Sequence, residues 1–221
     1  MDYQQLEKTL EEKVVLAVIT VDDADRAVPL ARALLRGGVS AVELTLRTPT
    51  ALESIERIVS EVPEMTVGAG TVLRPDQCYE VRRRGAKFAF APGMNPRVIE
   101  AAGRAGLPFV PGVATASEVE RAVELGCRVL KIFPSEDLGG VKHLKSLDGP
   151  YGFLNLRYVP LGGVNEENLA DYLALPSVIA VGGSWIAKPP MIREERWEEI
   201  EKNARAAMSV VEQQRRRNGG G

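Results

Sequence analysis

The sequence contains few residues suited to metal or disulfide chemistry. Two cysteines, Cys78 and Cys127, and one histidine, His143, occur among 221 residues. The cysteines lack CxxC spacing, so we expect buried small hydrophobes rather than a disulfide, a metal clip or a nucleophile. His143 stands between lysines, where a solvated helix position is expected rather than a catalytic one. These absences predict a protein that uses neither a metal nor another cofactor.

Long apolar runs and a strong charge imbalance are also missing. No stretch is long and apolar enough to span a bilayer, and residues 1–5 lack the basic and then apolar layout of a signal peptide. Basic residues number 28 and acidic residues 30, which gives no reason to expect nucleic acid or an anionic membrane as a partner. We therefore expect a cytoplasmic protein that binds a small molecule.

Short β-branched runs alternate with longer amphipathic stretches along the whole chain. This alternation is typical of repeated βα units around a parallel sheet, and eight units fit the length of one α/β barrel. The predicted strands are residues 14–20, 41–46, 66–70, 87–91, 108–111, 128–133, 156–160 and 178–181. The fold class is therefore predicted to be α/β, a single (β/α)8 TIM barrel.

The ends of the chain have their own predicted elements. A helix over residues 3–12 is expected to cover the bottom of the barrel, and a helix over 194–214 to complete it. Between them, residues 23–36 form a typical helix pattern, with Asp22 as the cap and Gly37-Gly38 as the stop. No linker interrupts the pattern, so residues 1–214 are predicted to be one barrel domain. Residues 215–221 have no apolar face and are predicted to be a flexible tail.

One predicted strand contains a lysine among apolar residues. Alternation in residues 129–133 places Val129, Lys131 and Phe133 on one face. Burial disfavours the charged form of an amine, and the neutral amine is the nucleophile. The alternative is a structural ion pair, or a lysine that extends out of the barrel end.

A second strand has charged residues on one face. In residues 41–47, Glu43 and Arg47 share a face with Thr45, while the other face is aliphatic. If the aliphatic face packs under the helices, Glu43 and Arg47 point into the barrel or its mouth, where Lys131 could meet them. Together the three would provide an amine nucleophile, a proton shuttle and a guanidinium anchor for a carboxylate.

Glycine pairs follow the last two predicted strands. Gly162-Gly163 comes after the seventh, and Gly182-Gly183, followed by Ser184, after the eighth. Barrels often bind phosphate at these two loops through backbone N–H groups. Each pair alone could equally be a turn or a helix-packing device. A further small-residue loop over 68–71 ends in Thr71, which can donate a hydrogen bond into the mouth.

Seven segments together resemble a known family. They are VELTLRT (42–48), VGAGTVL (67–73), APG (91–93), VPGV (110–113), LKIFP (130–134), GGV (162–164) and GGSW (182–185). From about Val15 to Trp185 the chain resembles the 2-keto-3-deoxy-6-phosphogluconate aldolases. That family includes 4-hydroxy-2-oxoglutarate aldolase activity and the related 6-phosphogalactonate enzymes.

The resemblance implies a class I aldolase, a lyase that splits a phosphorylated sugar acid into pyruvate and glyceraldehyde 3-phosphate. It implies that Lys131 forms the Schiff base and that Glu43 is the general acid and base. It further implies a homotrimer without metal or cofactor. The remaining implied roles are carboxylate binding by Arg47 and Thr71, pocket walls at Pro92 and Phe133, and phosphate binding at Gly162, Gly163, Gly183 and Ser184.

The chain departs from the gluconate-type pattern at Leu161. Those enzymes typically have a threonine before the Gly-Gly pair, whereas the galactonate-type relatives have an apolar residue there. Leucine cannot hydrogen-bond a substrate hydroxyl, so Leu161 is expected to line the pocket and to alter discrimination at that carbon. The gluconate epimer, the galactonate epimer and 4-hydroxy-2-oxoglutarate all remain open as substrates. A different phosphate-binding barrel enzyme and a non-catalytic phosphosugar binder or scaffold are further alternatives.

Overall fold

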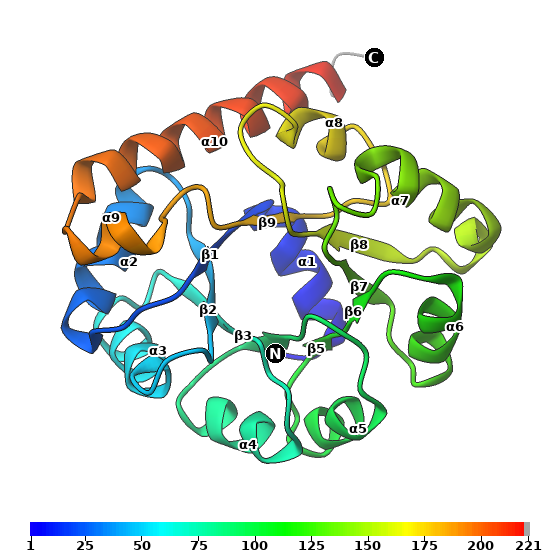
Figure 1. The fold of residues 1–221 in the computed structure, drawn as a ribbon, viewed down its shortest axis with the longest axis horizontal. Coiled ribbons are helices and arrows are strands. Elements are labelled where there is room, and N and C mark those ends of the chain that lie inside the picture. Colours follow the sequence, from blue (N-terminus) through cyan, green and yellow to red (C-terminus); the bar gives the residue numbers. More distant parts are fainter. Residues whose placement is uncertain (219–221) are drawn as a thin grey trace.

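A computed structural model describes residues 1–218 and shows a ring of parallel strands surrounded by helices (Figure 1). The strands are β1 (Val15–Ile19), β2 (Ala41–Thr45), β3 (Thr66–Gly70), β4 (Phe88–Phe90), β5 (Phe109–Val110), β6 (Gly112–Val113), β7 (Val129–Ile132), β8 (Arg157–Pro160) and β9 (Val181–Gly183). The α-helices are α1 (Tyr3–Lys13), α2 (Ala27–Arg36), α3 (Ala51–Glu61), α4 (Pro75–Arg83), α5 (Pro96–Arg104), α6 (Ala116–Glu124), α7 (Gly140–Asp148), α8 (Leu169–Leu173), α9 (Pro189–Arg193) and α10 (Trp197–Asn218). Two 3-10 helices, η1 (Ala24–Arg26) and η2 (Gly149–Leu154), complete the set. The predicted barrel fold is confirmed.

Nine strand segments occupy eight positions in the barrel. Hydrogen bonds connect them in the orders β5-β4-β3-β2-β1-β9 and β6-β7-β8. Only Pro111, which has no N–H to donate, separates β5 from β6, so these two form one barrel position. A bridge between Tyr158 and Val178 links β8 to the segment before β9. The ring therefore closes around a common interior.

Alternation along the strands separates two apolar layers. Val42, Leu44 and Leu130 belong to the large cluster that also includes helix residues, whereas Ala41 and Val129 belong to a second cluster of inward-facing residues. Glu43 and Lys131 follow Ala41 and Val129 by two positions, so they lie on the same strand faces and are directed into the barrel.

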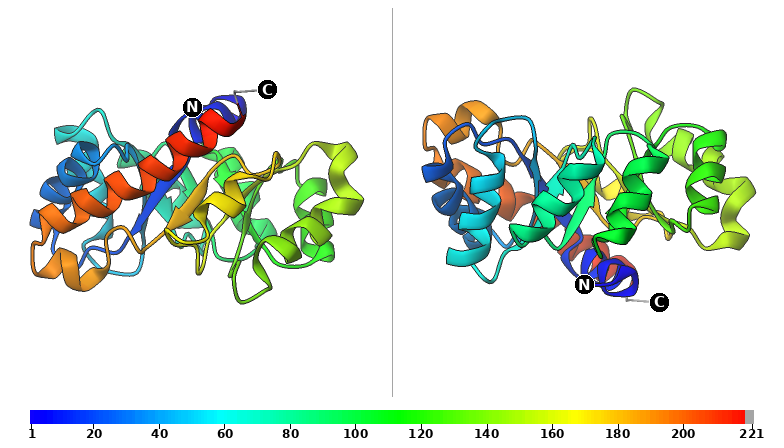
Figure 2. Two further views of the ribbon diagram at one scale, coloured as in Figure 1. Left: turned by 90° about the horizontal axis from the view of Figure 1, so that it is seen from above. Right: turned by 90° about the horizontal axis from the view of Figure 1, so that it is seen from below.

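Helix α1 closes one end of the barrel. Its two buried residues, Leu6 and Leu10, belong to the inner apolar cluster. Figure 1 shows α1 crossing behind the ring, and both views of Figure 2 place it beyond one end, beside the end of α10. This matches the helix predicted to cover the bottom of the barrel.

Strand pairing and helix capping explain two differences between predicted and observed boundaries, one at the last strand and one at the helix predicted from residue 23. The last strand was predicted at residues 178–181, but β9 begins at Val181, since Val181 and Gly183 pair with Val15 and Ala17 of β1. Its glycines have low strand propensity, so the pattern alone ended the strand too early. The helix predicted from residue 23 begins instead as η1, and its cap is Asp23, whose side chain accepts from Asp25 N.

The C-terminal helix also differs from prediction. Residues 194–196 form a turn between α9 and α10, with Glu195 at φ +53°, so the expected single start at 194 is wrong. Helix α10 continues to Asn218, four residues into the expected tail, and 219–221 lie outside the described residues. Within residues 1–218, no helix is both long and apolar enough to cross a membrane.

Candidate active site

Lys131 and Glu43 meet inside the barrel. Lys131 Nζ, from β7, donates a hydrogen bond of 3.3 Å to Glu43 Oε1, from β2. Only 6% of the lysine side chain and 1% of the glutamate side chain are exposed. The two residues lie 88 positions apart in the sequence, so barrel closure creates this pair.

Two aromatic rings flank the amine of this pair. The rings of Phe90 and Phe133 lie 5.7 and 5.1 Å from Nζ and favour a cation through their faces. Glu43 Oε2 is buried and accepts no hydrogen bond from any residue in 1–218. It is therefore available to a water or to a substrate proton.

A cavity of about 280 Å³ opens beside the pair, at the end of the barrel opposite α1. Its lining combines two basic groups, one acidic group, threonines and glycines. The lining residues are Val18, Thr20, Glu43, Thr45, Arg47, Lys131, Phe133, Leu161, Gly162, Gly182, Gly183, Ser184 and Pro189. Eight of the predicted site residues thus surround one cavity, and their individual roles stay predictions.

Three predicted site residues do not line this cavity directly. Thr71 accepts a 3.3 Å hydrogen bond from Arg47 Nε, and so orients the guanidinium at the mouth. Pro92 packs its carbonyl against Gly112, where an added Cβ would lie 2.3 Å from that oxygen. Gly112 pairs with Lys131, so Pro92 supports the lysine strand from the side. Gly163 lies one residue beyond the lining.

Gly70 makes room for the glutamate. A Cβ at residue 70 would lie 2.2 Å from Glu43 Oε1, which is far inside van der Waals contact. Any larger residue there would displace the carboxylate from Lys131. Gly70, the last residue of β3, therefore has a steric purpose that the sequence pattern did not specify.

The glycine loop after β8 has an unusual backbone conformation. Gly162 and Gly163 have φ of +87° and +84°, a region that side chains disfavour. Neither N–H finds an acceptor among residues 1–218, whereas both carbonyls accept hydrogen bonds. Two successive N–H groups are therefore available to a bound group.

A partly buried polar cluster holds this loop in place. Ser135 N donates to Leu161 O at 2.7 Å, and Glu136 N donates to Gly162 O at 2.9 Å. Tyr172 of α8 lies with its hydroxyl 2.8 Å from Ser135 Oγ and donates to Glu136. Burial, together with the hydrogen bond to Glu136, raises the pKa of Tyr172 above its usual range. The tyrosine therefore stays protonated and connects the two loops.

Sequence reasoning missed several lining residues. Thr20 and Thr45 share a 2.7 Å hydrogen bond between their hydroxyls. Thr45 lies on the same strand face as Glu43, and Thr20 directly follows β1. Their positions in the sequence could therefore have identified both as lining residues. Val18 shares the inward face of β1 with Leu16, so strand alternation could have identified it in the same way. Pro189 lies at the start of α9, and no local pattern placed it at the cavity.

The remaining candidate groups lie outside the cavity. Cys78 and Cys127 are buried and free, and burial raises the pKa of each thiol to about 11, so neither is a nucleophile near neutral pH. His143 is half-buried, with Nε2 3.1 Å from Ala114 O. Among residues 1–218, no group of three or more His, Cys, Asp or Glu residues is arranged to hold a metal.

Comparison with known proteins agrees with this geometry. The family model for KDPG and KHG aldolase matches residues 6–203. The chain is 42% identical over 203 residues to 2-dehydro-3-deoxy-phosphogluconate aldolase of Dickeya dadantii, covering 92% of this chain and 94% of that protein. It is 43% identical over 202 residues to the KHG/KDPG aldolase of Escherichia coli K12, covering 91% and 94%.

A solved structure shows the same fold at similar coverage. The KDPG aldolase of Legionella pneumophila, with pyruvate captured as a covalent carbinolamine, superposes with a TM-score of 0.86. The two chains are 36% identical, and the match covers 91% of this chain and 97% of that one. The chain therefore belongs to the KDPG and KHG aldolase family.

Proposed function

We propose that this protein is a class I aldolase that cleaves 2-keto-3-deoxy-6-phosphogluconate to pyruvate and glyceraldehyde 3-phosphate. The observation that supports this most directly is the buried Lys131 amine, 3.3 Å from the buried Glu43 carboxylate. An amine, a proton acceptor and a guanidinium around one cavity meet the needs of Schiff-base chemistry.

In the proposed mechanism Lys131 first transfers a proton to Glu43, and its neutral Nζ attacks the C2 ketone. The carbinolamine then loses water as Glu43 returns the proton to the departing hydroxyl, which leaves an iminium. Arg47 at the mouth binds the C1 carboxylate and fixes the orientation of the ketone, with Thr71 holding the guanidinium. Phe133 walls the pyruvyl end of the cavity.

Carbon–carbon cleavage uses the iminium as the electron sink. Glu43, directly or through a water, removes the proton from the C4 hydroxyl, and the C3–C4 electron pair moves toward the iminium nitrogen. Glyceraldehyde 3-phosphate leaves, and the enamine that remains is protonated at C3 by Glu43 or its water. Hydrolysis of the resulting imine releases pyruvate and restores the lysine.

The phosphate is proposed to bind at the two glycine loops. Gly162 and Gly163 offer N–H groups without acceptors in residues 1–218, and Gly183 with the exposed Ser184 lies across the mouth. Binding energy gained at this remote group positions the reacting bond.

Leu161 supports a second candidate substrate, the 6-phosphogalactonate epimer. Its side chain is buried, lines the cavity and lies against Gly182, where an added Cβ would be 2.6 Å from Leu161 Cγ. The leucine side chain cannot form a hydrogen bond with a substrate hydroxyl, so it does not favour the gluconate configuration at C4 over the galactonate configuration. A third candidate is 4-hydroxy-2-oxoglutarate, which would leave the glycine loops without a phosphate.

We also propose that the protein assembles as a homotrimer. Exposed apolar side chains at Leu73 and Phe153, 52% and 80% exposed, support an interface on the outer surface. Sedimentation equilibrium would test this: a mass of one or two chains contradicts the proposal.

Borohydride trapping tests the imine directly. Incubation with pyruvate and borohydride, followed by peptide mapping, should place the reduced adduct on Lys131. Lys131→Arg should abolish the label, whereas Lys145→Arg on the exposed face of α7 serves as the matched control and should retain it. A label on another lysine would overturn the assignment.

A coupled assay for pyruvate release identifies the substrate. Run with the gluconate epimer, the galactonate epimer and 4-hydroxy-2-oxoglutarate at equal concentrations, it ranks their kcat/KM values. No turnover with any of the three, together with no trapped adduct, would favour a non-catalytic binder.

A further inference from the structure

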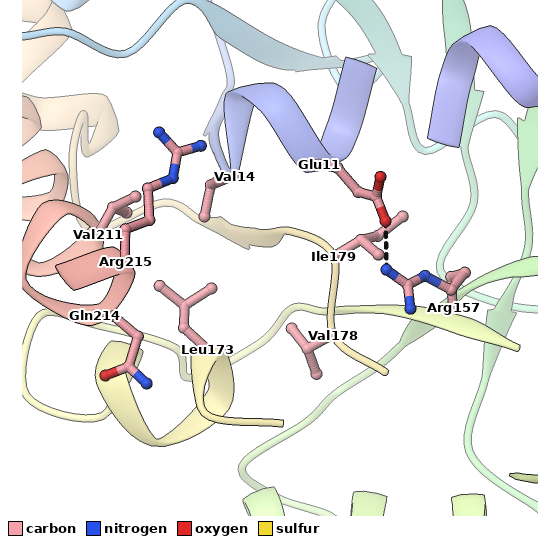
Figure 3. Close-up of a pocket in the computed structure, with 9 residues that line it drawn as sticks. All are labelled: Glu11, Val14, Arg157, Leu173, Val178, Ile179, Val211, Gln214 and Arg215. Carbon is pink, nitrogen blue, oxygen red and sulfur yellow. Dashed lines mark hydrogen bonds and ion pairs between the residues drawn. The ribbon is translucent and has the colours of Figure 1, made fainter. Parts of the chain in front are cut away.

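A second cavity lies at the opposite end of the barrel from Lys131, among α1, β8, α8 and α10 (Figure 3). Its volume is about 190 Å³. The lining residues are Glu11, Val14, Arg157, Leu173, Val178, Ile179, Val211, Gln214 and Arg215. The proposed aldolase chemistry makes no use of any of them.

The cavity has an apolar middle and polar sides. Figure 3 shows Arg215 and Gln214 on one side and Glu11 with Arg157 on the other, with the aliphatic side chains between them. Those aliphatic residues come from distant parts of the chain: the end of α1, the end of α8, the segment before β9, and α10. A ligand here would need an apolar body and a polar end.

The two arginines differ in how they are paired. Arg157 Nη2 donates to Glu11, its Nη1 donates to Pro176 O at 3.1 Å, and its Nε lies 3.4 Å from Glu7. Two carboxylates therefore compensate its charge.

Arg215 has no such compensation. Arg215 is exposed, its Nη2 donates to the backbone carbonyl of Glu12 at 3.0 Å, and no carboxylate within residues 1–218 pairs with it. A guanidinium with unused donors beside an apolar cavity favours an anionic group on the ligand, and a carboxylate fits its planar fork.

The same cavity includes a strained residue. Val14 links α1 to β1 with φ +63°, although a β-branched side chain strongly disfavours that region. Strained residues of this kind occur preferentially at ligand clamps and switch regions. Val14 O accepts from Val181 N at 2.7 Å, so the strained residue also contacts the start of β9.

We propose that this cavity binds a small monocarboxylate with a compact apolar body of about six carbons, its carboxylate held by Arg215. The size follows from volume, because a cavity of roughly 150 Å³ lined by aliphatic and aromatic side chains accepts one benzene. The site is separate from the catalytic cavity, so the ligand binds without displacing substrate.

Calorimetric titration of the purified protein with hexanoate, butyrate and hexanol tests the proposal. Hexanoate should bind one per chain with a Kd of about 1 mM or tighter. Butyrate should bind about 15-fold more weakly, since each lost methylene reduces affinity about fourfold. Hexanol should bind about tenfold more weakly than hexanoate, because it lacks the charge-assisted hydrogen bond.

Three variants separate this site from others. Arg215→Ala should weaken hexanoate about tenfold while leaving hexanol unchanged. Arg216→Ala removes the same charge from the neighbouring exposed position outside the lining and should change nothing. Arg47→Ala should also leave binding unchanged, because it alters only the catalytic cavity. The proposal is overturned if hexanoate shows no saturable binding, if Arg215→Ala binds it normally, or if Arg47→Ala abolishes it.

Discussion

Removing one member of the Lys131–Glu43 pair should destabilise the protein far more than removing both. The charges are 3.3 Å apart and nearly inaccessible to water. At an effective dielectric constant of about 20, their attraction is about 5 kcal/mol. Lys131→Met leaves the Glu43 carboxylate buried without its partner, and we expect a loss of about 3 to 5 kcal/mol in the free energy of unfolding.

The double variant Lys131→Met/Glu43→Met should recover most of that loss. Both charges are then replaced by apolar side chains of similar length, and we expect stability within about 1 kcal/mol of the parent protein. The coupling energy between the two sites should therefore be about 3 kcal/mol or more. All variants in the cycle should be inactive in the aldol assay.

Urea unfolding followed by circular dichroism at one fixed protein concentration measures the cycle, since unfolding of an oligomer depends on concentration. Arg104→Met with Glu100→Met provides the matched control, because this ion pair on α5 is exposed and its coupling should be small. A coupling energy below about 1 kcal/mol at Lys131–Glu43 would refute the view that these charges interact in a water-poor interior.

Four further predictions concern activity and reactivity. Glu43→Gln should lower kcat about 100-fold or more, with a smaller effect on pyruvate trapping, because the amide cannot move protons; unchanged turnover would remove Glu43 from the mechanism. Gly162→Ala should raise KM for the phosphorylated substrate about tenfold or more while pyruvate trapping persists, since its φ of +87° and the 2.9 Å approach to Pro134 Cα leave no place for a Cβ. Leu161→Thr should raise the ratio of kcat/KM for the gluconate epimer to kcat/KM for the galactonate epimer by about tenfold. An unchanged ratio would show that the side chain at residue 161 does not contact the C4 hydroxyl. Burial raises the pKa of Cys78 and of Cys127 to about 11, so neither thiol should react with a thiol reagent at pH 8 in the folded protein, and both should react after unfolding. Reaction of either cysteine in the native state would show that the structure around it opens to solvent.

Much of the catalytic cavity could be predicted from local rules. Side chains alternate along a strand, so the pattern placed Lys131 on one face with Val129 and Phe133, and Glu43 on the face opposite the aliphatic residues of its strand. The carboxyl ends of barrel strands form one surface, so glycine pairs after two strands were expected to lie together. Each rule is applied to one strand and the loop that follows it, so it requires only residues that are close together in the sequence.

Other features required the closed structure. Three examples depend on contacts between distant segments: the steric need for Gly70, the hydrogen bond between Thr20 and Thr45, and the link from Tyr172 through Glu136 to Gly162. The position of β9 was decided by pairing with β1, against the low strand propensity of its glycines.

The sequence by itself determined the barrel class, the residues that share a strand face with each reactive group, and the glycine loops that follow the last strands. These depend on strand periodicity and on turn chemistry, which are properties of neighbouring residues. Only the tertiary structure decided that Lys131 Nζ reaches Glu43 Oε1 across the interior and that Arg215 and Val14 line the same second cavity. Such distances follow from how the ring closes and how α1 and α10 pack on it, which no local pattern specifies.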